Sequence, residues 1–414
     1  MKYASYLRCS TRLHACIKSD GEPNSWVHCS CTSCMEEPKC DRLCLGPVKG
    51  KEQMAPMHVL LSYGYHEGTT GVYLERALRQ IANVTTVGAG RGAELADLDI
   101  LIPYAAARTR PECFLYVDSG KWTFPRNIHR LPIPTACYLI DTHIGLQRRR
   151  KMARLFDFVF VAQRDDVHSF RSAGGEAIWL PLAADQELCL SRKSTNLYDL
   201  AFVGQLHTPY YPRAQVIGEL SKHVRMNEQG RYYSPEEMAT VYSESAMVLN
   251  LPIRRDVNMR VFEALGCGSL LISTPMANAF DELLTPGEEC IIADGPLLPV
   301  ICYWLAHAEE RERIALAGRR AVLARHTYLH RARSIVQAVL GRDAPLKSVL
   351  KRSPYVENAE IHLGSGYSAG VYRSVRDGFL TGTRPSAPDG RILLSLAANT
   401  FGKQLQRRYR KVVG

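Results

Sequence analysis

A guanidinium and a carboxylate lie three residues apart in the segment 254–273, as Arg260 and Glu263. At that spacing two side chains share one face of a helix. A carboxylate at the carboxyl edge of a parallel sheet can accept both ribose hydroxyls of a nucleotide. A guanidinium can hold a diphosphate in a forked geometry. The alternative is a solvent-facing ion pair on an amphipathic helix, because exposed pairs at this spacing are common.

The helix that carries this pair is predicted from the apolar spacing of the same segment. Its buried face is expected to hold Val261, Phe262 and Leu265. Asp256 can cap the amino end of the helix, and Gly266 and Gly268 can end it.

A second set of polar side chains follows a buried-strand pattern at residues 133–140. The pattern ends in Asp141 and His143, and open α/β sheets bind ligands at the carboxyl ends of their strands. His143 could orient an acceptor or relay a proton, or it could be a satisfied structural histidine. Asp141 could act as a base or cap the next element.

Apolar runs alternate with helical or polar stretches along most of the chain, and these elements must position the polar residues. The first series of strand-like runs lies at residues 58–62, 84–88, 99–103, 113–117, 135–140 and 158–162. After a polar stretch, a second series follows at 200–204, 247–251, 269–273 and 290–294. Runs that are apolar throughout suit parallel sheets covered on both faces. The sequence therefore predicts an α/β fold of two Rossmann-like doubly wound domains.

The two series also predict the domain boundaries. Residues 57–195 form the first Rossmann-like domain and residues 196–345 the second. Residues 303–340 read as helical with a break near His326, where Thr327 can cap the next helix. Residues 346–414 form a basic extension without a predicted structure, and residues 1–56 form a Cys-rich leader.

The segment N-M-R-V-F-E, from Asn258 to Glu263, is one of several motifs that together resemble a known family. The others are DFVFVAQ at 157–163, WLPLAA at 179–184, GEE at 287–289 and HTYLHR at 326–331. Over residues 57–341 they resemble the spore-maturation CgeB-like glycosyltransferases, within the group 1-like family. The resemblance implies the GT-B fold, in which two Rossmann-like domains face each other across a cleft.

The resemblance assigns roles on the donor side. The backbone of Gly204 would approach the donor diphosphate and Arg213 would neutralise it, although Gly204 could also mark a plain strand-to-helix turn. Asn258, Arg260 and Glu263 would complete the donor site in the second domain.

The first domain carries its own part of the resemblance. The loop with Gly64, Gly68 and Gly71 is similar to the glycine-rich loop that brings backbone amides near the donor phosphate. No G-K-[ST] follows, so this loop is not a P-loop. His143, with Asp141, would face the transferred sugar.

One position departs from the large retaining branch of the GT-B fold. That branch has a first Glu eight positions before the residue equivalent to Glu263, whereas this chain has Arg255 there. The pair Asp97 and Asp99 mimics the metal-binding D-x-D of the other major glycosyltransferase fold. We interpret it as structural, because it precedes a predicted strand and the GT-B fold normally works without a metal.

The resemblance implies a glycosyltransferase that moves a sugar from a nucleotide diphospho-sugar to an acceptor, with retention of anomeric configuration. The acceptor could be a glycan, a lipid or a protein, such as a cell-envelope or spore glycan. No cofactor and no essential metal are expected. The alternatives are a sugar epimerase with the same fold and a non-catalytic nucleotide-sugar-binding protein. No nucleic-acid recognition module is visible, so no nucleic-acid partner is expected.

The charge of the 414-residue chain is a net +11, which suits an anionic partner. Basic runs lie at residues 148–151 and 403–411, and they are either solvated segments or contacts with a membrane surface. No apolar run approaches the roughly 20 residues that span a bilayer, and the first 30 residues lack the apolar core of a secretory signal. We expect a cytoplasmic protein, with peripheral contact at the inner membrane face left open.

The leader concentrates cysteines that could bind zinc. The candidate ligands are Cys29, Cys31, Cys34, Cys40 and Cys44. Their spacing matches no standard pair of C-x2-C knuckles. The alternatives are a disordered leader, or a leader that is not translated because the chain begins at Met54 or Met57.

Overall fold

The computed structural model describes residues 56–88, 98–118, 124–171, 176–189, 196–207, 212–340, 354–364 and 368–380, and residues 392, 395, 396 and 398. All of them lie in one compact unit, Ala55–Gly414. The five candidate zinc ligands, Asp97 and the basic run at 403–411 lie outside the described residues.

Six parallel strands form the first sheet. They are β1 (His58–Ser62), β2 (Asn83–Val87), β3 (Cys113–Val117), β4 (Thr135–Leu139), β5 (Phe158–Val161) and β6 (Glu176–Trp179), in the order β2-β1-β3-β4-β5-β6. The strands β1, β3, β4 and β5 are buried along their whole length, as expected for apolar runs covered on both faces. The strand order reverses direction between β1 and β3, which makes the carboxyl ends of these strands a topological switch point.

Four parallel strands form the second sheet, in the order β10-β9-β8-β7. They are β7 (Tyr198–Ala201), β8 (Ser245–Asn250), β9 (Leu270–Ser273) and β10 (Ile291–Ile292). Leu200 of β7 also forms a parallel bridge with Met226 on its other side. The order therefore reverses between β7 and β8. The predicted fold class, two Rossmann-like doubly wound domains, is confirmed.

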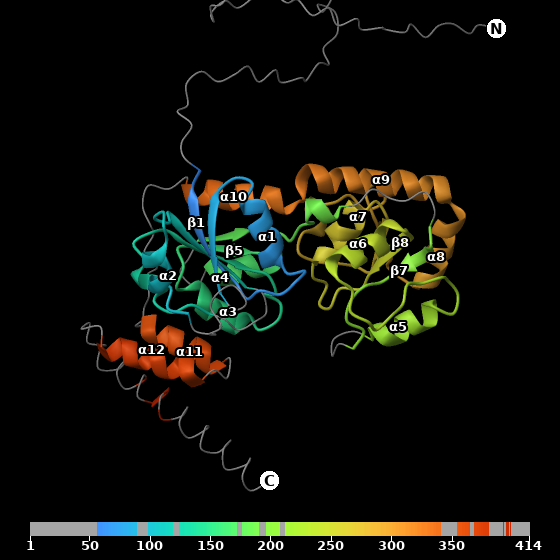
Figure 1. The fold of residues 1–414 in the computed structure, drawn as a ribbon. Helices are drawn as coiled ribbons and strands as arrows, with labels where there is room; N and C mark the ends of the chain where they lie inside the picture. The colour runs from blue at the N-terminus through green and yellow to red at the C-terminus, as the bar shows by residue number, and fades with distance from the viewer. Residues whose placement is uncertain are drawn as a thin grey trace, which may run out of the picture. The chain divides into compact units, whose positions relative to one another are not determined.

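Helices cover both sheets (Figure 1). Those of the first series are α1 (Thr70–Leu78), α2 (Leu101–Ala106), η1 (Ile128–Arg130), α3 (Leu146–Ala153), η2 (Arg164–Asp166), α4 (Val167–Arg171) and η3 (Gln186–Leu188). Those of the second series are α5 (Arg213–Leu220), α6 (Pro235–Ser243), α7 (Met259–Gly266), η4 (Phe280–Glu282), α8 (Leu297–Ala306), α9 (Ala308–Arg325) and α10 (Tyr328–Leu340).

Two predictions about local structure were wrong. Residues 99–103 were predicted as a strand, but Leu101–Ala106 is helix α2, whose first amide donates to Asp99 Oδ1 at 3.2 Å. Ile102 is 66% exposed, so this apolar run does not lie in a covered sheet. Asp256 was predicted to cap the helix around Phe262, but α7 has Asn258 at its N-cap. Asp256 Oδ1 instead accepts from the Ile253 amide at 2.8 Å, which closes the preceding loop.

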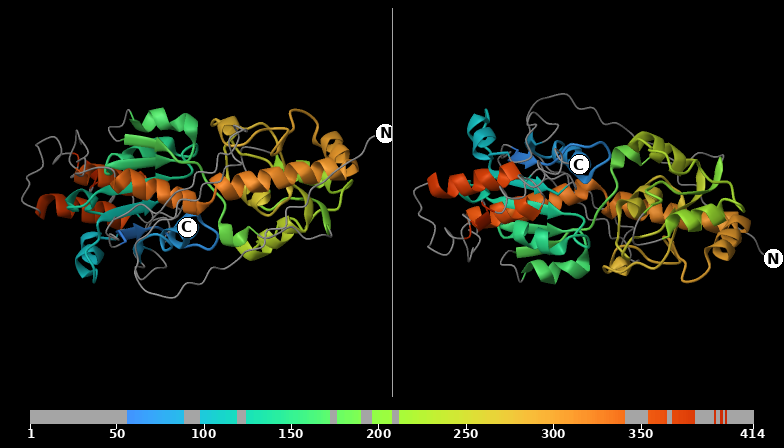
Figure 2. Two further views of the ribbon diagram at one scale, coloured as in Figure 1. Left: turned by 90° about the horizontal axis from the view of Figure 1, so that it is seen from above. Right: turned by 90° about the horizontal axis from the view of Figure 1, so that it is seen from below.

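The predicted helical break at His326 separates α9 from α10. After the break the chain returns to the first sheet, where α10 packs against α1 (Figures 1 and 2). A parallel bridge between Ala184 and Thr327 joins the segment that leaves the first sheet after β6 to the segment that returns to it before α10. One apolar cluster accordingly contains Leu74 of α1, Phe262 of α7 and other buried residues of both sheets.

The C-terminal extension contains two helices that the sequence did not predict, α11 (Pro354–Gly364) and α12 (Ser368–Leu380). They pack against each other, and α11 packs against α3. Helix α3 carries the basic run at 148–151, and Lys151 pairs with Glu360 of α11 at 2.5 Å. Arg154 pairs with Glu357 at 3.0 Å. Part of the basic character of this run is therefore matched within the protein.

Candidate functional site

The switch point of the second sheet brings two loops together, residues 202–207 after β7 and residues 251–258 after β8. Ligands of open α/β sheets bind at such points because the loops diverge there and leave room at the carboxyl edge. The predicted donor-side residues lie in these loops or in the helices that follow them.

Arg260 and Gly204 are in direct contact at this edge. Arg260 donates from Nε and Nη2 to the Val203 carbonyl at 3.1 and 2.7 Å, and from Nη1 to Asn250 Oδ1 at 3.0 Å. A Cβ on Gly204 would lie 2.3 Å from Arg260 Nη2, which is too close for two unbonded atoms. A residue with a side chain at this position would therefore displace the Arg260 guanidinium.

Arg213 lies near the same place but is committed to the backbone. It is buried, and it donates to the carbonyls of Leu251 and Gln205, the latter at 3.1 Å. The guanidinium carbons of Arg213 and Arg260 lie 5.8 and 4.6 Å from the ring centroid of Phe202. The two arginines therefore converge at the switch point and hold both of its loops. Whether Arg213 also contacts a diphosphate stays a prediction.

Asn258 is linked to Arg260 through Asn250, a residue that was not among the predicted site residues. Its Nδ2 donates to Asn250 Oδ1 at 3.0 Å, the atom that also accepts from Arg260. Asn250 is fully buried at the end of β8. Asn258 Oδ1 is buried at the amino end of α7 and has no hydrogen-bond partner among the described residues.

Glu263 is half-buried on α7 and does not form a surface ion pair with Arg260, whose guanidinium is bound to Val203 and Asn250. Burial raises the pKa of the Glu263 carboxyl from 4.5 to about 7. Arg260 opposes this rise in pKa, and the negative charge of Asp185 adds to it. Burial and, in turn, the charge of Glu263 raise the pKa of Tyr73 on α1 and of Tyr242, so this carboxyl lies near buried tyrosines rather than in bulk solvent.

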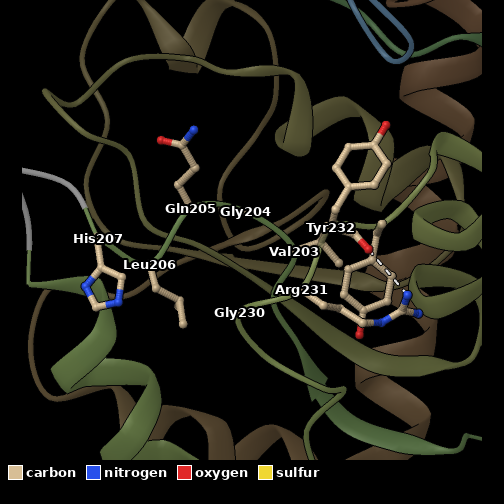
Figure 3. Close-up of a pocket in the computed structure, with 9 residues that line it drawn as sticks. Val203, Gly204, Gln205, Leu206, His207, Gly230, Arg231 and Tyr232 are labelled. Atoms are coloured by element: carbon tan, nitrogen blue, oxygen red, sulfur yellow. Dashed lines mark hydrogen bonds between the residues drawn. The ribbon is translucent and has the colours of Figure 1, made fainter.

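A pocket of about 550 Å³ opens beside Gly204 (Figure 3). One wall comes from the loop after β7 and the other from the loop before α6, so that Gln205 and His207 lie opposite Arg231 and Tyr232. Its lining residues are Val203, Gly204, Gln205, Leu206, His207, Gly230, Arg231, Tyr232 and Tyr233. Two tyrosines and the guanidinium of Arg231, which lies 3.8 Å from the ring centroid of Tyr233, make this wall suited to a flat aromatic ligand.

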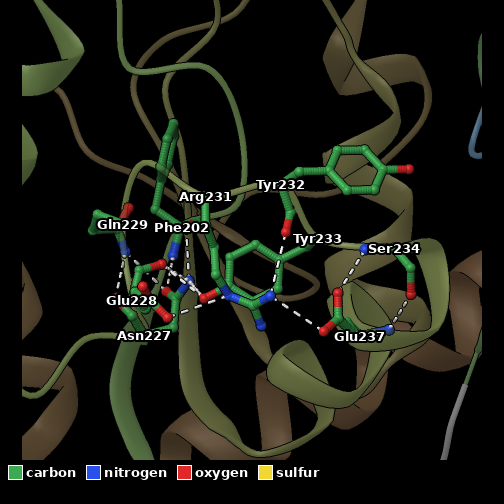
Figure 4. A network of polar contacts seen from close by, with 9 residues as sticks. All are labelled: Phe202, Asn227, Glu228, Gln229, Arg231, Tyr232, Tyr233, Ser234 and Glu237. Carbon is green, nitrogen blue, oxygen red and sulfur yellow. Dashed lines mark hydrogen bonds and ion pairs between the residues drawn. The ribbon is translucent and has the colours of Figure 1, made fainter.

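A buried asparagine fixes that wall (Figure 4). Asn227 accepts from the Phe202 amide at 2.9 Å, and its Nδ2 donates to the Phe202 carbonyl at 3.1 Å. Tyr233 donates to the Glu228 carbonyl at 2.7 Å. A capping box at Ser234 and Glu237 then starts α6. No pattern in the sequence indicated Asn227, because its role depends on the bridge between Leu200 and Met226.

The glycine-rich loop of the first domain lies against the start of α6. Gly68 has a φ of 72°, and a Cβ there would lie 3.3 Å from Pro235 Cγ. Gly71 opens α1 against the Tyr63 ring, where a Cβ would lie 2.4 Å from a ring carbon. Gly64 precedes them in the same loop. The small size of Gly68 and Gly71 therefore serves close packing, and a contact of this loop with phosphate stays a prediction.

Asp141 and His143 lie at the carboxyl end of β4, as their position in the sequence predicts. Burial and the neighbouring Asp118 raise the pKa of the Asp141 carboxyl, against the opposing charge of Arg149. Thr142 Oγ1 and His143 Nδ1 are buried and have no hydrogen-bond partner among the described residues. This segment thus gathers a carboxylate, a hydroxyl and an imidazole at the end of β4.

Two motifs of the family resemblance connect the two domains. Gln163 is buried, and its amide side chain bonds both the amide and the carbonyl of Val257 at 3.2 Å. Arg331 donates to the carbonyls of Pro181 and Leu182 at 2.7 and 3.0 Å. The DFVFVAQ and HTYLHR motifs therefore hold the loops and the linker that position the site.

No group of three or more His, Cys, Asp or Glu side chains that could hold a metal occurs in the described part of the chain. Asp99, one half of the D-x-D pattern, accepts from Asn127 Nδ2 at 2.9 Å and from the Leu101 amide. Within the same described ranges, no helix combines the length and the apolar character that a membrane crossing requires.

Comparison with known proteins supports the fold, and one family match covers the second sheet. Residues 190–337 match the family described as glycosyl transferase-like. No curated protein matches the chain.

Among solved structures, the chain is similar to Anabaena HepE in complex with UDP and glucose, at 11% identity and a TM-score of 0.50 over 69% of this chain and 100% of that one. It is similar to sucrose-phosphate synthase of Thermosynechococcus elongatus, at 12% identity and a TM-score of 0.51. The match covers 69% of this chain and 98% of that one. It is also similar to a glycosyltransferase of Rickettsia africae, at 8% identity and a TM-score of 0.52. The match covers 70% of this chain and 100% of that one. These likenesses show that the chain has the GT-B fold.

Proposed function

We propose that the protein transfers a sugar from a nucleotide diphospho-sugar to an acceptor. The observation that carries the proposal is the contact between Gly204 and Arg260 at the mouth of an aromatic-walled pocket, at the switch point of the second sheet. The matching glycosyl transferase-like family covers this region, and the similar Anabaena protein binds UDP and glucose. The motifs further favour a place near the CgeB-like group.

We assign each part of the donor to the part of the site whose chemistry suits it. The base stacks in the pocket beside Tyr232, and the diphosphate lies over the backbone of Gly204 next to Arg260. Glu263 accepts from the ribose hydroxyls. Because the pKa of this carboxyl is raised to about 7, its ionised, accepting form increases as the pH rises through 7. Donor binding should therefore strengthen over that range.

The departing nucleoside diphosphate develops negative charge as the bond to the sugar breaks. Guanidinium and amide groups already aimed at that charge lower the barrier, because they need no reorganisation. In this proposal Arg260 supplies that stabilisation without an essential metal. On the acceptor side, Asp141 accepts the acceptor proton or orients its hydroxyl, with His143 beside it. The transfer proceeds with retention of configuration.

Thermal-shift measurements with nucleoside diphosphates and their sugars test the proposal. A ligand at about 100 times its dissociation constant adds roughly 2.7 kcal/mol of stability. We expect one base to stabilise the protein, and Arg260→Ala to abolish that effect while the exposed Arg320→Gln control keeps it. Product analysis then separates the alternatives. Conversion of the donor without an acceptor would indicate an epimerase, and binding without transfer or hydrolysis would indicate a non-catalytic protein.

A further inference from the structure

Asn250 is the last residue of β8, and its side chain is fully buried. Its Oδ1 accepts from Arg260 Nη1 and from Asn258 Nδ2, both at 3.0 Å. Its Nδ2 donates to Ser273 Oγ at 3.1 Å, at the end of the neighbouring strand β9. Ser273 Oγ donates its own hydrogen to the Thr274 carbonyl at 2.8 Å, which leaves it to accept from Asn250. This series of bonds fixes the orientation of the amide, with its oxygen toward Arg260.

The groups that hold Arg260 in place are uncharged. Its Nε and Nη2 donate to the Val203 carbonyl, and its Nη1 donates to Asn250. The Phe202 ring centroid lies 4.6 Å from the guanidinium carbon, a contact that stabilises a cation without neutralising it. Arg260 forms no ion pair within the described part of the chain, and Glu263 acts on it only through the longer-range effect on the Glu263 pKa. Its positive charge is therefore not neutralised by a paired carboxylate of the fold.

The same guanidinium lies at the mouth of the pocket beside Gly204. Arg260 is half-buried, and its Nη2 would lie 2.3 Å from a Cβ on Gly204, a residue that lines the pocket. The end of β8 therefore fixes a cation at the carboxyl edge of the sheet, where open α/β sheets bind their ligands.

We propose that Asn250 is a positioning residue, which holds Arg260 beside the donor diphosphate through a neutral acceptor and so leaves the guanidinium its charge for the ligand. The inference rests on the proposed function, which places the diphosphate over Gly204. A carboxylate at position 250 would accept the same bond, but its charge would cancel much of the attraction of Arg260 for an anion. An aliphatic side chain there would leave Nη1 without its acceptor. Asparagine avoids both effects.

Paired titrations of the full chain test this assignment, with uridine against UDP and guanosine against GDP, each followed by calorimetry. For one base, the ratio of the two dissociation constants measures what the diphosphate contributes to binding. We expect the diphosphate to bind at least about ten-fold tighter than its nucleoside, the change that one charge-assisted contact supplies. In Asn250→Asp, which has nearly the same shape, this preference should fall below about three-fold, while affinity for the nucleoside changes by less than about three-fold. A merely structural role would weaken both ligands together.

Further variants separate the position of Arg260 from the fold around it. Asn250→Ala should lose the same preference, and adding it to Arg260→Ala should weaken diphosphate binding no further, because both act through one guanidinium. Ser273→Ala removes the acceptor that orients the Asn250 amide and should lower the preference about three-fold. Asn227→Ala loosens the wall of the base pocket instead, so it should weaken nucleoside and diphosphate by the same factor. The exposed Arg320→Gln should change neither.

The assignment is overturned if either Asn250 variant keeps the full preference for the diphosphate, or loses affinity for nucleoside and diphosphate alike. If neither variant folds, Ser273→Ala decides, and an unchanged preference in it overturns the assignment. In each of these cases the unsubstituted protein still binds a nucleotide, so the proposed function stands. A protein that binds neither member of either pair would refute the proposed function, and the role of Asn250 with it.

Discussion

Replacing Glu263 with Gln should make the protein more stable and, at the same time, worse at binding its donor. The pKa of this carboxyl is raised from 4.5 to about 7, so the folded state holds its proton more tightly than the unfolded state. The stability of the folded protein therefore falls as the pH rises from about 4.5 to 7 and stays low above that. At about 1.4 kcal/mol per pKa unit the full shift is an upper limit of roughly 3 kcal/mol. Because the side chain is half-buried and partly screened by water, we expect about 1–2 kcal/mol.

Gln cannot ionise and has nearly the shape of the protonated acid, so the variant escapes this penalty. At pH 8 its melting temperature should exceed that of the unsubstituted protein by roughly 1–3 °C, the shift that about 1–2 kcal/mol causes in a chain of this length. At pH 5 the difference should shrink below about 1 kcal/mol, since Glu263 is then largely protonated in the folded protein. Donor affinity at pH 8 should fall about ten-fold or more, because the charged acceptor for the ribose is lost.

Differential scanning calorimetry at pH 5 and pH 8 checks the predicted change in stability. Calorimetric titration with the stabilising nucleotide checks the predicted loss of affinity. The exposed Glu288→Gln serves as the control and should change neither quantity. A lower melting temperature for Glu263→Gln at both pH values would refute the electrostatic reasoning. Higher stability with unchanged affinity for every nucleotide would refute the ribose assignment alone.

The other predictions concern the pocket, its supporting contacts and the leader. Gly204→Ala should displace the Arg260 guanidinium, lowering stability by about 1–2 kcal/mol and weakening nucleotide binding, as calorimetry would measure. Asn227→Ala should leave the Phe202 amide and carbonyl unpaired and cost about 1–3 kcal/mol, with weaker nucleotide binding; unchanged values would mean that the wall holds without it. Asp141→Asn should reduce transfer at least about ten-fold while donor affinity stays the same, and equal turnover would remove Asp141 from the acceptor side. A chain that starts at Met57 should melt and bind donor like the full chain, whereas essential stoichiometric zinc in the full chain would contradict this.

The sequence by itself determined the two parallel sheets, because a strand covered on both faces must be apolar throughout, and such runs are visible without any contacts. It located the helix with Arg260 and Glu263 by its periodicity, and it placed Asp141 and His143 at the end of a strand. It failed at residues 99–103, where a short apolar run next to Asp99 forms an exposed helix instead. Periodicity cannot separate a short strand from a short helix when the deciding factor is burial.

Only the tertiary structure decided how these residues are used. Arg260 reaches the Val203 carbonyl, a contact between residues 57 positions apart. Because the guanidinium lies so close, a side chain at position 204 would collide with it, and no local sequence pattern shows this. The structure also showed that Glu263 is half-buried, with its pKa raised to about 7, and not part of the alternative solvent-facing pair, because burial is a property of the assembled fold. Likewise, the contacts of Asn227 and Asn250 became visible only where segments distant along the chain meet at one edge of a sheet.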